Sequence, residues 1–218
     1  MKSYASKLKV SVLISSKNQF SIPKIIQNFK HNKVKYELII VDLFKNFKKS
    51  NLTILNSYNK PTQCYEIALN SSQSEFILFW PDDCFFQKKN SLDKLYELSK
   101  KNKKTLFSPR LSNNINLSLN SYRFHPEIPN SPLIPLGPLI ERKIFKKIKT
   151  LDKNFIATFY DMDIYLRLIS IGYKVKYTNI FVKEKKYSNY SLNLDYSSKD
   201  RKYLDSLWTQ KSKRFTKS

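Results

Sequence analysis

Five aspartates stand where carboxylates could do chemistry, at the end of a predicted strand or the start of a predicted helix. They are Asp42, Asp82, Asp83, Asp161 and Asp163. Asp82 and Asp83 follow the apolar run at 76–80 after a single proline. Hard divalent cations prefer oxygen ligands and commonly bridge a protein to a phosphate group. The adjacent pair therefore predicts a cation site beyond the end of a buried strand.

Each of these aspartates also has a purely structural interpretation that the sequence leaves open. Pro-Asp-Asp is good turn chemistry, and Asp42 could equally open a turn. Asp161 and Asp163 could complement a helix dipole, an interaction that stabilises a helix by about 0.3 to 1 kcal/mol. The same dipole is expected to lower the pKa of Asp161 and to weaken it as a base.

Alternating strand and helix patterns would position these residues. Short apolar runs predict buried strands at 10–15, 36–42, 52–55, 76–80 and 105–108. Helical spacing predicts helices that begin near Ser21, Pro61 and Ser91. A strand, a helix and a strand within about 30 residues form a βαβ unit with parallel strands, and we expect the strand at 105–108 to return to the same sheet. Because parallel strands end on one edge, Asp42 and Asp83 are expected to share a pocket.

The second half of the chain has a weaker pattern. Five prolines between 126 and 138 predict an irregular segment. Helices are predicted at 139–148 and 159–171, and Gly172 is placed to end the second helix in the left-handed conformation. A strand is predicted at 173–177. Beyond about 184 the chain is rich in Lys, Ser and Tyr with weak periodicity, which predicts a basic tail at 186–218.

The composition indicates a single globular domain and excludes several classes. The 218 residues are 41% hydrophobic and 14% aromatic, too many for a disordered chain. No apolar run approaches the roughly 20 residues that cross a bilayer, and no signal peptide is evident, so we expect a cytoplasmic protein. Cys64 and Cys84 match no metal spacing and predict no disulfide framework. The net charge of +23 favours polyanions, but no nucleic-acid motif accompanies it, so no specific nucleic acid is expected.

Six segments, in their order and spacing, resemble the inverting family 2 glycosyltransferases of GT-A fold. They are VSVLISSKN, YELIIVD, EFILFWPDD, PLGPLIERKIFKKI, LDKNF and YDMDIYLRLISIGYKV, within residues 8–183. The resemblance implies a GT-A-like (Rossmann-like) α/β/α sandwich with a mostly parallel central sheet. It implies one domain over 1–218, with a nucleotide-sugar half at about 8–110, an acceptor half at about 111–185 and the basic tail. The implied function is metal-dependent, inverting transfer of a sugar from a nucleotide-sugar donor to a hydroxyl of a glycan or lipid-linked acceptor.

The resemblance assigns roles on the donor side residue by residue. Asp42 matches the acid that holds the nucleotide base, and Ser16 is expected nearby. Asp82 and Asp83 fall on the acidic motif, with Asp83 the closer match to the ligand of Mn²⁺ or Mg²⁺. Such a cation neutralises the charge that builds on the leaving diphosphate.

On the acceptor side, Asp161 falls on the aspartate that acts as general base and removes the proton of the attacking hydroxyl. Asp163 and Arg167 belong to the same motif and are expected near the acceptor, although Arg167 could equally form a surface ion pair. The segments 126–138 and beyond 184 are expected to line the acceptor side.

Departures from the family pattern keep other functions open. Leu43 and Phe44 follow Asp42 where the family often has an acid and Gly-Ser, and Tyr160 replaces the acid before the proposed base. Residues 182–188 contain no histidine; His31 and His125 are expected to be surface or structural residues. One alternative is a catalytically inactive GT-A-like binding domain. Another is a basic protein that binds nucleic acid or an anionic membrane, and peripheral contact with the inner face of a membrane is compatible with the basic surface.

Overall fold

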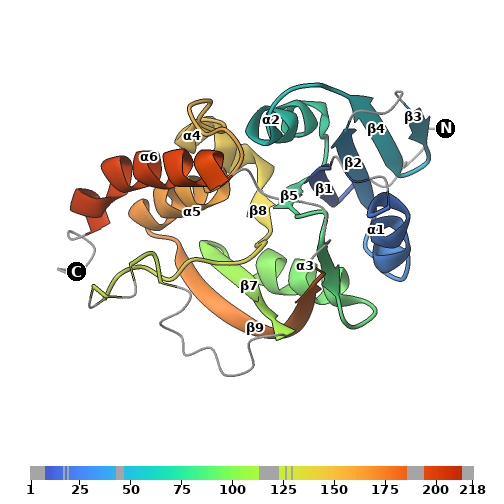
Figure 1. Cartoon of the computed structure of the whole chain (residues 1–218). Coiled ribbons are helices and arrows are strands. Elements are labelled where there is room, and N and C mark those ends of the chain that lie inside the picture. Colours follow the sequence, from blue (N-terminus) through green and yellow to red (C-terminus); the bar gives the residue numbers. More distant parts are fainter. Residues whose placement is uncertain are drawn as a thin grey trace.

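The computed structural model describes residues 8–16, 18, 20–42, 47–112, 123–125, 127–128, 130–185 and 194–212. Within them a six-stranded central sheet has the order β3-β4-β2-β1-β5-β8 (Figure 1). Four neighbouring strands are parallel: β1 (Val10–Ser15), β2 (Tyr36–Asp42), β4 (Leu52–Asn56) and β5 (Phe76–Phe79). The edge strands β3 (Phe47–Lys49) and β8 (Ile140–Glu141) are antiparallel to their neighbours. The predicted mostly parallel sheet is confirmed.

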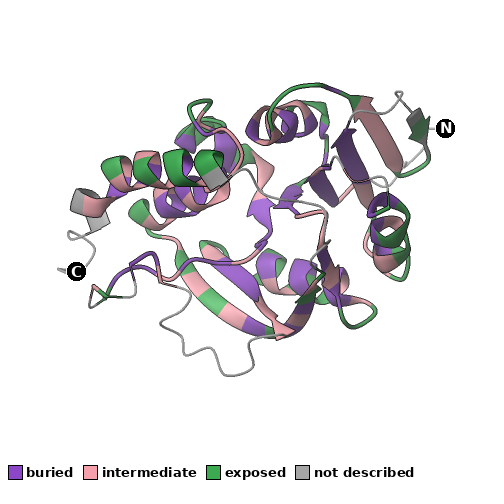
Figure 2. Ribbon diagram, in the orientation of Figure 1, coloured by how far each residue is buried: buried purple, intermediate pink, exposed green. Residues whose placement is uncertain are grey.

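Helices cover both faces of this sheet because its strands are apolar on both sides. Along β1, Val12 contributes to the core that contains α1 (Ile22–Phe29) and α3 (Ser91–Lys101). Leu13 contributes to the opposite core, which contains α2 (Pro61–Ser71). Figure 2 shows the central strands buried between these layers. The α/β/α sandwich expected from the sequence is the observed fold.

A second sheet lies beside the first and was not predicted. Its order is β6-β9-β7, from β6 (Cys84–Phe86), β9 (Lys174–Glu184) and β7 (Thr105–Leu111). The expectation that the strand at 105–108 returns to the central sheet is wrong. β8 pairs with β5 at that edge of the central sheet, and β7 pairs in parallel with β9 instead.

The second half contains the predicted second helix. The predicted helix at 139–148 is instead β8, a short 3₁₀ turn at Arg142–Ile144 and α4 (Phe145–Ile148). α5 (Tyr160–Ser170) forms as predicted. Gly172 follows it at φ 90° and donates its N–H to the Ile169 carbonyl at 3.0 Å, the left-handed ending that favours glycine.

The C-terminal segment contains the helix α6 (Leu194–Ser212) where the sequence predicted a tail. Figure 1 shows α6 lying along α5. Leu204 and Trp208 are buried in the same core as Ile164 and Leu168 of α5. Only a few apolar side chains of α6 meet the core, which explains why its periodicity is weak in the sequence. None of the helices in the described ranges has the length and apolar character to cross a membrane.

Candidate functional site

Ser16, Asp42 and Asp82 meet at the carboxyl edge of three adjacent parallel strands. The Ser16 N–H donates to the Val41 carbonyl at 3.1 Å, so the end of β1 lies against the end of β2. The Trp80 N–H donates to the Leu13 carbonyl at 2.9 Å, which brings the end of β5 to the other side of β1. The strand register therefore gathers the predicted donor-side residues on one edge.

Ser16 and Asp82 are in direct contact. The buried Ser16 hydroxyl donates to Oδ2 of Asp82 at 2.6 Å and lies 3.2 Å from the Ser21 hydroxyl at the start of α1. Burial raises the pKa of Asp82, and the hydrogen bonds from the two serines lower it only in part. The loop after β1 thus holds one carboxylate of the acidic pair.

Asp83 faces two other carboxylates. Burial raises its pKa first, and the charges of Asp82 and Glu184 raise it further. Its carbonyl accepts the Lys185 N–H at 2.8 Å, which joins it to the end of β9. Carboxylates that raise one another's pKa in this way favour a neutralising cation or proton. Glu184 was not predicted, because it reaches the site only through the β6–β9 pairing.

The acidic pair suits a divalent cation that takes its other ligands from a substrate. No group of three or more His, Cys, Asp or Glu in the described part of the chain is arranged to hold a metal ion. Mg²⁺ sites are commonly built from one or two carboxylates together with substrate phosphates. The oxygen donors and mutual repulsion of Asp82 and Asp83 fit such a cation.

Tyr65 of α2 connects the acidic pair to Asp161. Its hydroxyl donates to the Trp80 carbonyl at 3.0 Å, and its ring centroid lies 4.8 Å from that of Tyr160, the first residue of α5. Burial raises the pKa of Tyr65, and the charges of Asp82 and Asp161 raise it further. The end of β5 and the start of α5 therefore adjoin one buried phenol. Tyr65 carries no sequence signal beyond its place in a predicted helix.

Asp161 is partly buried in the first turn of α5. Burial raises its pKa, and the Met162 N–H, which donates to Oδ1 at 2.9 Å, lowers it only in part. The net shift is opposite to the one expected from the helix dipole, because loss of water outweighs the local donors. A carboxylate with a raised pKa is a stronger base.

Asp42 is buried at the end of β2 with 1% exposure. Its carbonyl accepts the Ser57 N–H at 2.7 Å after β4, so it lies at the same strand edge as Ser16. Residues 43–46, where the sequence departs from the family pattern, lie outside the described residues. The base-binding role of Asp42 stays a prediction.

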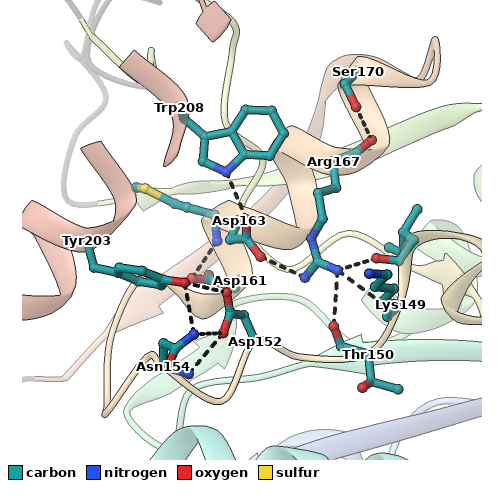
Figure 3. Close-up of polar contacts among 12 residues, drawn as sticks. Lys149, Thr150, Asp152, Asn154, Asp161, Asp163, Arg167, Ser170, Tyr203 and Trp208 are labelled. Carbon is teal, nitrogen blue, oxygen red and sulfur yellow. Dashed lines mark hydrogen bonds and ion pairs between the residues drawn. The ribbon is translucent and has the colours of Figure 1, made fainter. Parts of the chain in front are cut away.

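Asp163 and Arg167 form a buried network on another side of α5 (Figure 3). The Trp208 indole N–H donates to Oδ1 of Asp163 at 2.8 Å, and Arg167 pairs with Oδ2 at 2.7 Å. Arg167 also donates to the Ile148 carbonyl and, at 3.1 Å, to that of Thr150. Residues two apart on a helix point about 200° from each other, so Asp163 turns away from Asp161. The network ties α5 to α6 and to the loop after α4.

Arg167→Gln tests whether this network is structural or binds acceptor. We expect the free energy of unfolding to fall by about 2 to 4 kcal/mol, because the buried Asp163 carboxylate loses its charged partner. Urea unfolding measures this, with exposed Lys147→Gln as the charge-matched control. Unchanged stability together with weaker acceptor binding would favour the acceptor-side prediction instead.

Cavities along the described residues include three of about 520, 550 and 840 Å³. Asp163 and Arg167 line the second, beside Trp208. His31 lines the first, and His125 is buried with its Nδ1 3.0 Å from Oε1 of Glu127. None of the three cavities is lined by Asp42, Asp83 or Asp161. The hollow expected between these acids stays a prediction.

The order of the central sheet and its flanking helices match the GT-A-like fold. Solved structures with this fold include TarS from S. aureus, residues 1–349. The TM-score is 0.57 at 13% identity, over 79% of this chain and 60% of that chain. For the TarS complex with UDP-GlcNAc the TM-score is 0.58 at 16% identity, over 88% of this chain and 64% of that chain. For the TarS complex with UDP the TM-score is 0.57 at 15% identity, over 80% of this chain and 60% of that chain.

These comparisons bear on the fold alone. This chain spans less than two thirds of each TarS 1–349 structure. No protein-family model matches the sequence, and no curated protein matches it either.

Proposed function

We propose that this chain is a glycosyltransferase that uses a nucleotide-sugar donor. The observation that carries the proposal is the placement of Tyr65, which donates to the Trp80 carbonyl two residues before Asp82 and packs against Tyr160 next to Asp161. Ligands of open α/β sheets bind at this edge. The shared fold supports the same function, since TarS was crystallised with UDP and with UDP-GlcNAc.

The donor would lie across the ends of β1, β2 and β5. In this proposal Asp42 holds the nucleotide base and Ser16 lies near the nucleotide. Asp83, helped by Asp82, holds Mn²⁺ or Mg²⁺. When bound, the cation supplies positive charge next to the diphosphate as it leaves. The hydroxyls of Ser16 and Ser21 orient Asp82 for this task.

Asp161 would act as the general base of an inverting transfer. It takes the proton of the acceptor hydroxyl as the oxygen attacks the sugar carbon on the face opposite the nucleotide, so the configuration inverts in one displacement. Its raised pKa favours proton uptake in the transition state. Tyr160, which replaces the family's preceding acid, stacks on Tyr65, so its ring supports the site instead of adding a second carboxylate.

The acceptor proposed here is a hydroxyl of a glycan or of a lipid-linked sugar. A net charge of +23 suits an acceptor at an anionic surface, and we keep peripheral membrane contact as part of the proposal.

A thermal-shift panel of nucleotide sugars tests the donor proposal. At a donor concentration 100 times Kd, binding adds about 2.7 kcal/mol, which raises the melting temperature by roughly 5 to 10 °C. We expect UDP-sugars with Mn²⁺ to give this rise and the same sugars with a chelator to give much less. The absence of any rise across UDP-, GDP- and ADP-sugars would contradict a donor site.

A further inference from the structure

The buried carboxylate of Asp200 is unexplained by the roles assigned so far. Asp200 lies on α6 with 1% exposure. Its Oδ1 accepts the Ile156 N–H at 2.9 Å, and its Oδ2 accepts the N–H groups of Ala157 and Thr158 at 2.8 Å each. The Thr158 hydroxyl adds a contact at 3.3 Å. A buried charge is retained only when it is well hydrogen-bonded, so this carboxylate and the 156–158 backbone form one unit.

The loop held by Asp200 leads directly to the proposed base. Thr158 is followed by Phe159 at φ 60°, a left-handed conformation that costs energy for an aromatic residue. Tyr160 and Asp161 come next, as the first two residues of α5. A turn strained in this way persists only when its surroundings hold it in place.

Two elements supply that restraint. The Thr62 N–H at the start of α2 donates to the Ile156 carbonyl at 3.4 Å, three residues from Tyr65. From α6, the Arg201 guanidinium lies 5.8 Å from the Phe159 ring centroid, next in sequence to Asp200. The turn is thus fixed between α2, whose Tyr65 contacts the acidic strand edge, and α6.

We propose that Asp200 is a positioning residue for Asp161, holding the 156–159 turn so that the first turn of α5 presents Asp161 beside Tyr65. The inference rests on the proposed function only where it names Asp161 as the base. Asp200 itself touches neither donor nor acceptor. Its action is to fix the distance between the start of α5 and the end of β5.

Asp200→Asn tests this role, because the amide retains one acceptor oxygen but turns an NH₂ group toward backbone donors. We expect kcat for transfer to fall by up to about 100-fold with the donor KM unchanged, because a misplaced catalytic group loses rate steeply. A base that moves into water loses the burial that raises its pKa, so the acidic limb of the pH profile should shift to lower pH. Asp195→Asn, an exposed position on the same helix, is the matched control.

A carboxyl NMR titration of Asp161 provides a measurement that needs no turnover. We expect its pKa to fall in Asp200→Asn and also in Asp200→Glu, which keeps the charge but displaces the loop by a methylene. Tyr65, Tyr160 and Tyr165 interact electrostatically with Asp161, and they stay protonated while a carboxyl titrates because burial raises their pKa values. Amide hydrogen exchange at Ile156 should accelerate in both variants.

The outcomes separate this inference from the proposed function. An Asp161 titration that shifts in Asp200→Asn but not in Asp200→Glu would indicate a charge effect and overturn positioning. Unchanged titration and unchanged kcat in folded Asp200→Asn would also overturn it. If that variant does not fold, Asp200→Glu decides on the same measurements. A wild-type protein that transfers no sugar would contradict the proposed function and leave the titration test in force.

Discussion

Asp161→Asn should lower the rate of sugar transfer about 10²- to 10⁴-fold, the contribution typical of a general base. The asparagine oxygen can still accept the Met162 N–H, now 2.9 Å from Asp161 Oδ1, so the start of α5 should keep its geometry. Donor binding should therefore stay within about twofold, since only proton removal is lost. Steady-state transfer and donor titration on the same variant measure the two effects. Equal loss of both would show that Asp161 does not act as the base.

The same variant should be more stable than the wild type at neutral pH. Burial raises the pKa of folded Asp161, so between the ordinary aspartate value of about 3.9 and the raised value the native state binds the proton more tightly than the unfolded state. Stability contributed by this group therefore falls as pH rises through that window. Asparagine removes the cost of burying the Asp161 charge, which raises the melting temperature. This gain should vanish at pH values below the ordinary aspartate pKa. The exposed Asp195→Asn variant is the control.

The central sheet was predictable because local pattern and global fold agree there. The apolar runs of β1, β2 and β5 are buried on both faces, and short βαβ connections leave parallel pairing as the simple solution. The shared carboxyl edge followed from that pairing. Ser16, Asp42 and Asp82 meet there for the same reason, so this much of the candidate site could be found without coordinates.

The second sheet and α6 could not be predicted because they depend on pairing between distant segments. β6 has only three residues and becomes a strand by pairing with β9, about a hundred residues later in the chain. β7 has the local pattern of a strand, but that pattern does not tell which strand it pairs with. Because β8 occupies the edge of the central sheet beside β5, β7 pairs with β9. Leu204 and Trp208 become core residues only once α5 is in place.

Three residues of the candidate site were missed for the same physical reason. Glu184 reaches Asp83 through the β6–β9 ladder, and Tyr65 has the ordinary spacing of a core residue in α2. Asp200 resembles one more charge on a polar helix until its three backbone partners are known. Their roles come from tertiary contacts, which sequence spacing does not encode.

Asp83→Asn should abolish the rise in melting temperature that Mn²⁺ adds to a nucleotide-sugar donor, and should lower transfer by about 10²-fold or more. A cation next to a leaving phosphate contributes several kcal/mol to the transition state, and each 1.36 kcal/mol is tenfold in rate. An amide in place of Asp83 removes the charge that attracts the cation. The melting temperature without ligand should not fall, because burial and neighbouring carboxylates already disfavour the Asp83 charge. Differential scanning fluorimetry with and without Mn²⁺ measures both effects.

Glu184→Gln separates a metal ligand from a general charge effect at this site. Glu184 is the other carboxylate besides Asp82 whose charge raises the pKa of Asp83, and it lies at the end of β9 beyond the acidic pair. Removing it relieves repulsion and lowers the pKa of Asp83, so the cation-dependent shift should persist. If instead both variants lose that shift to the same extent, the site responds to total negative charge and Asp83 has no special role. If the cation-dependent shift persists in Glu184→Gln but is lost in Asp83→Asn, Asp83 must contact the cation directly, because each substitution removes one carboxylate from the same cluster.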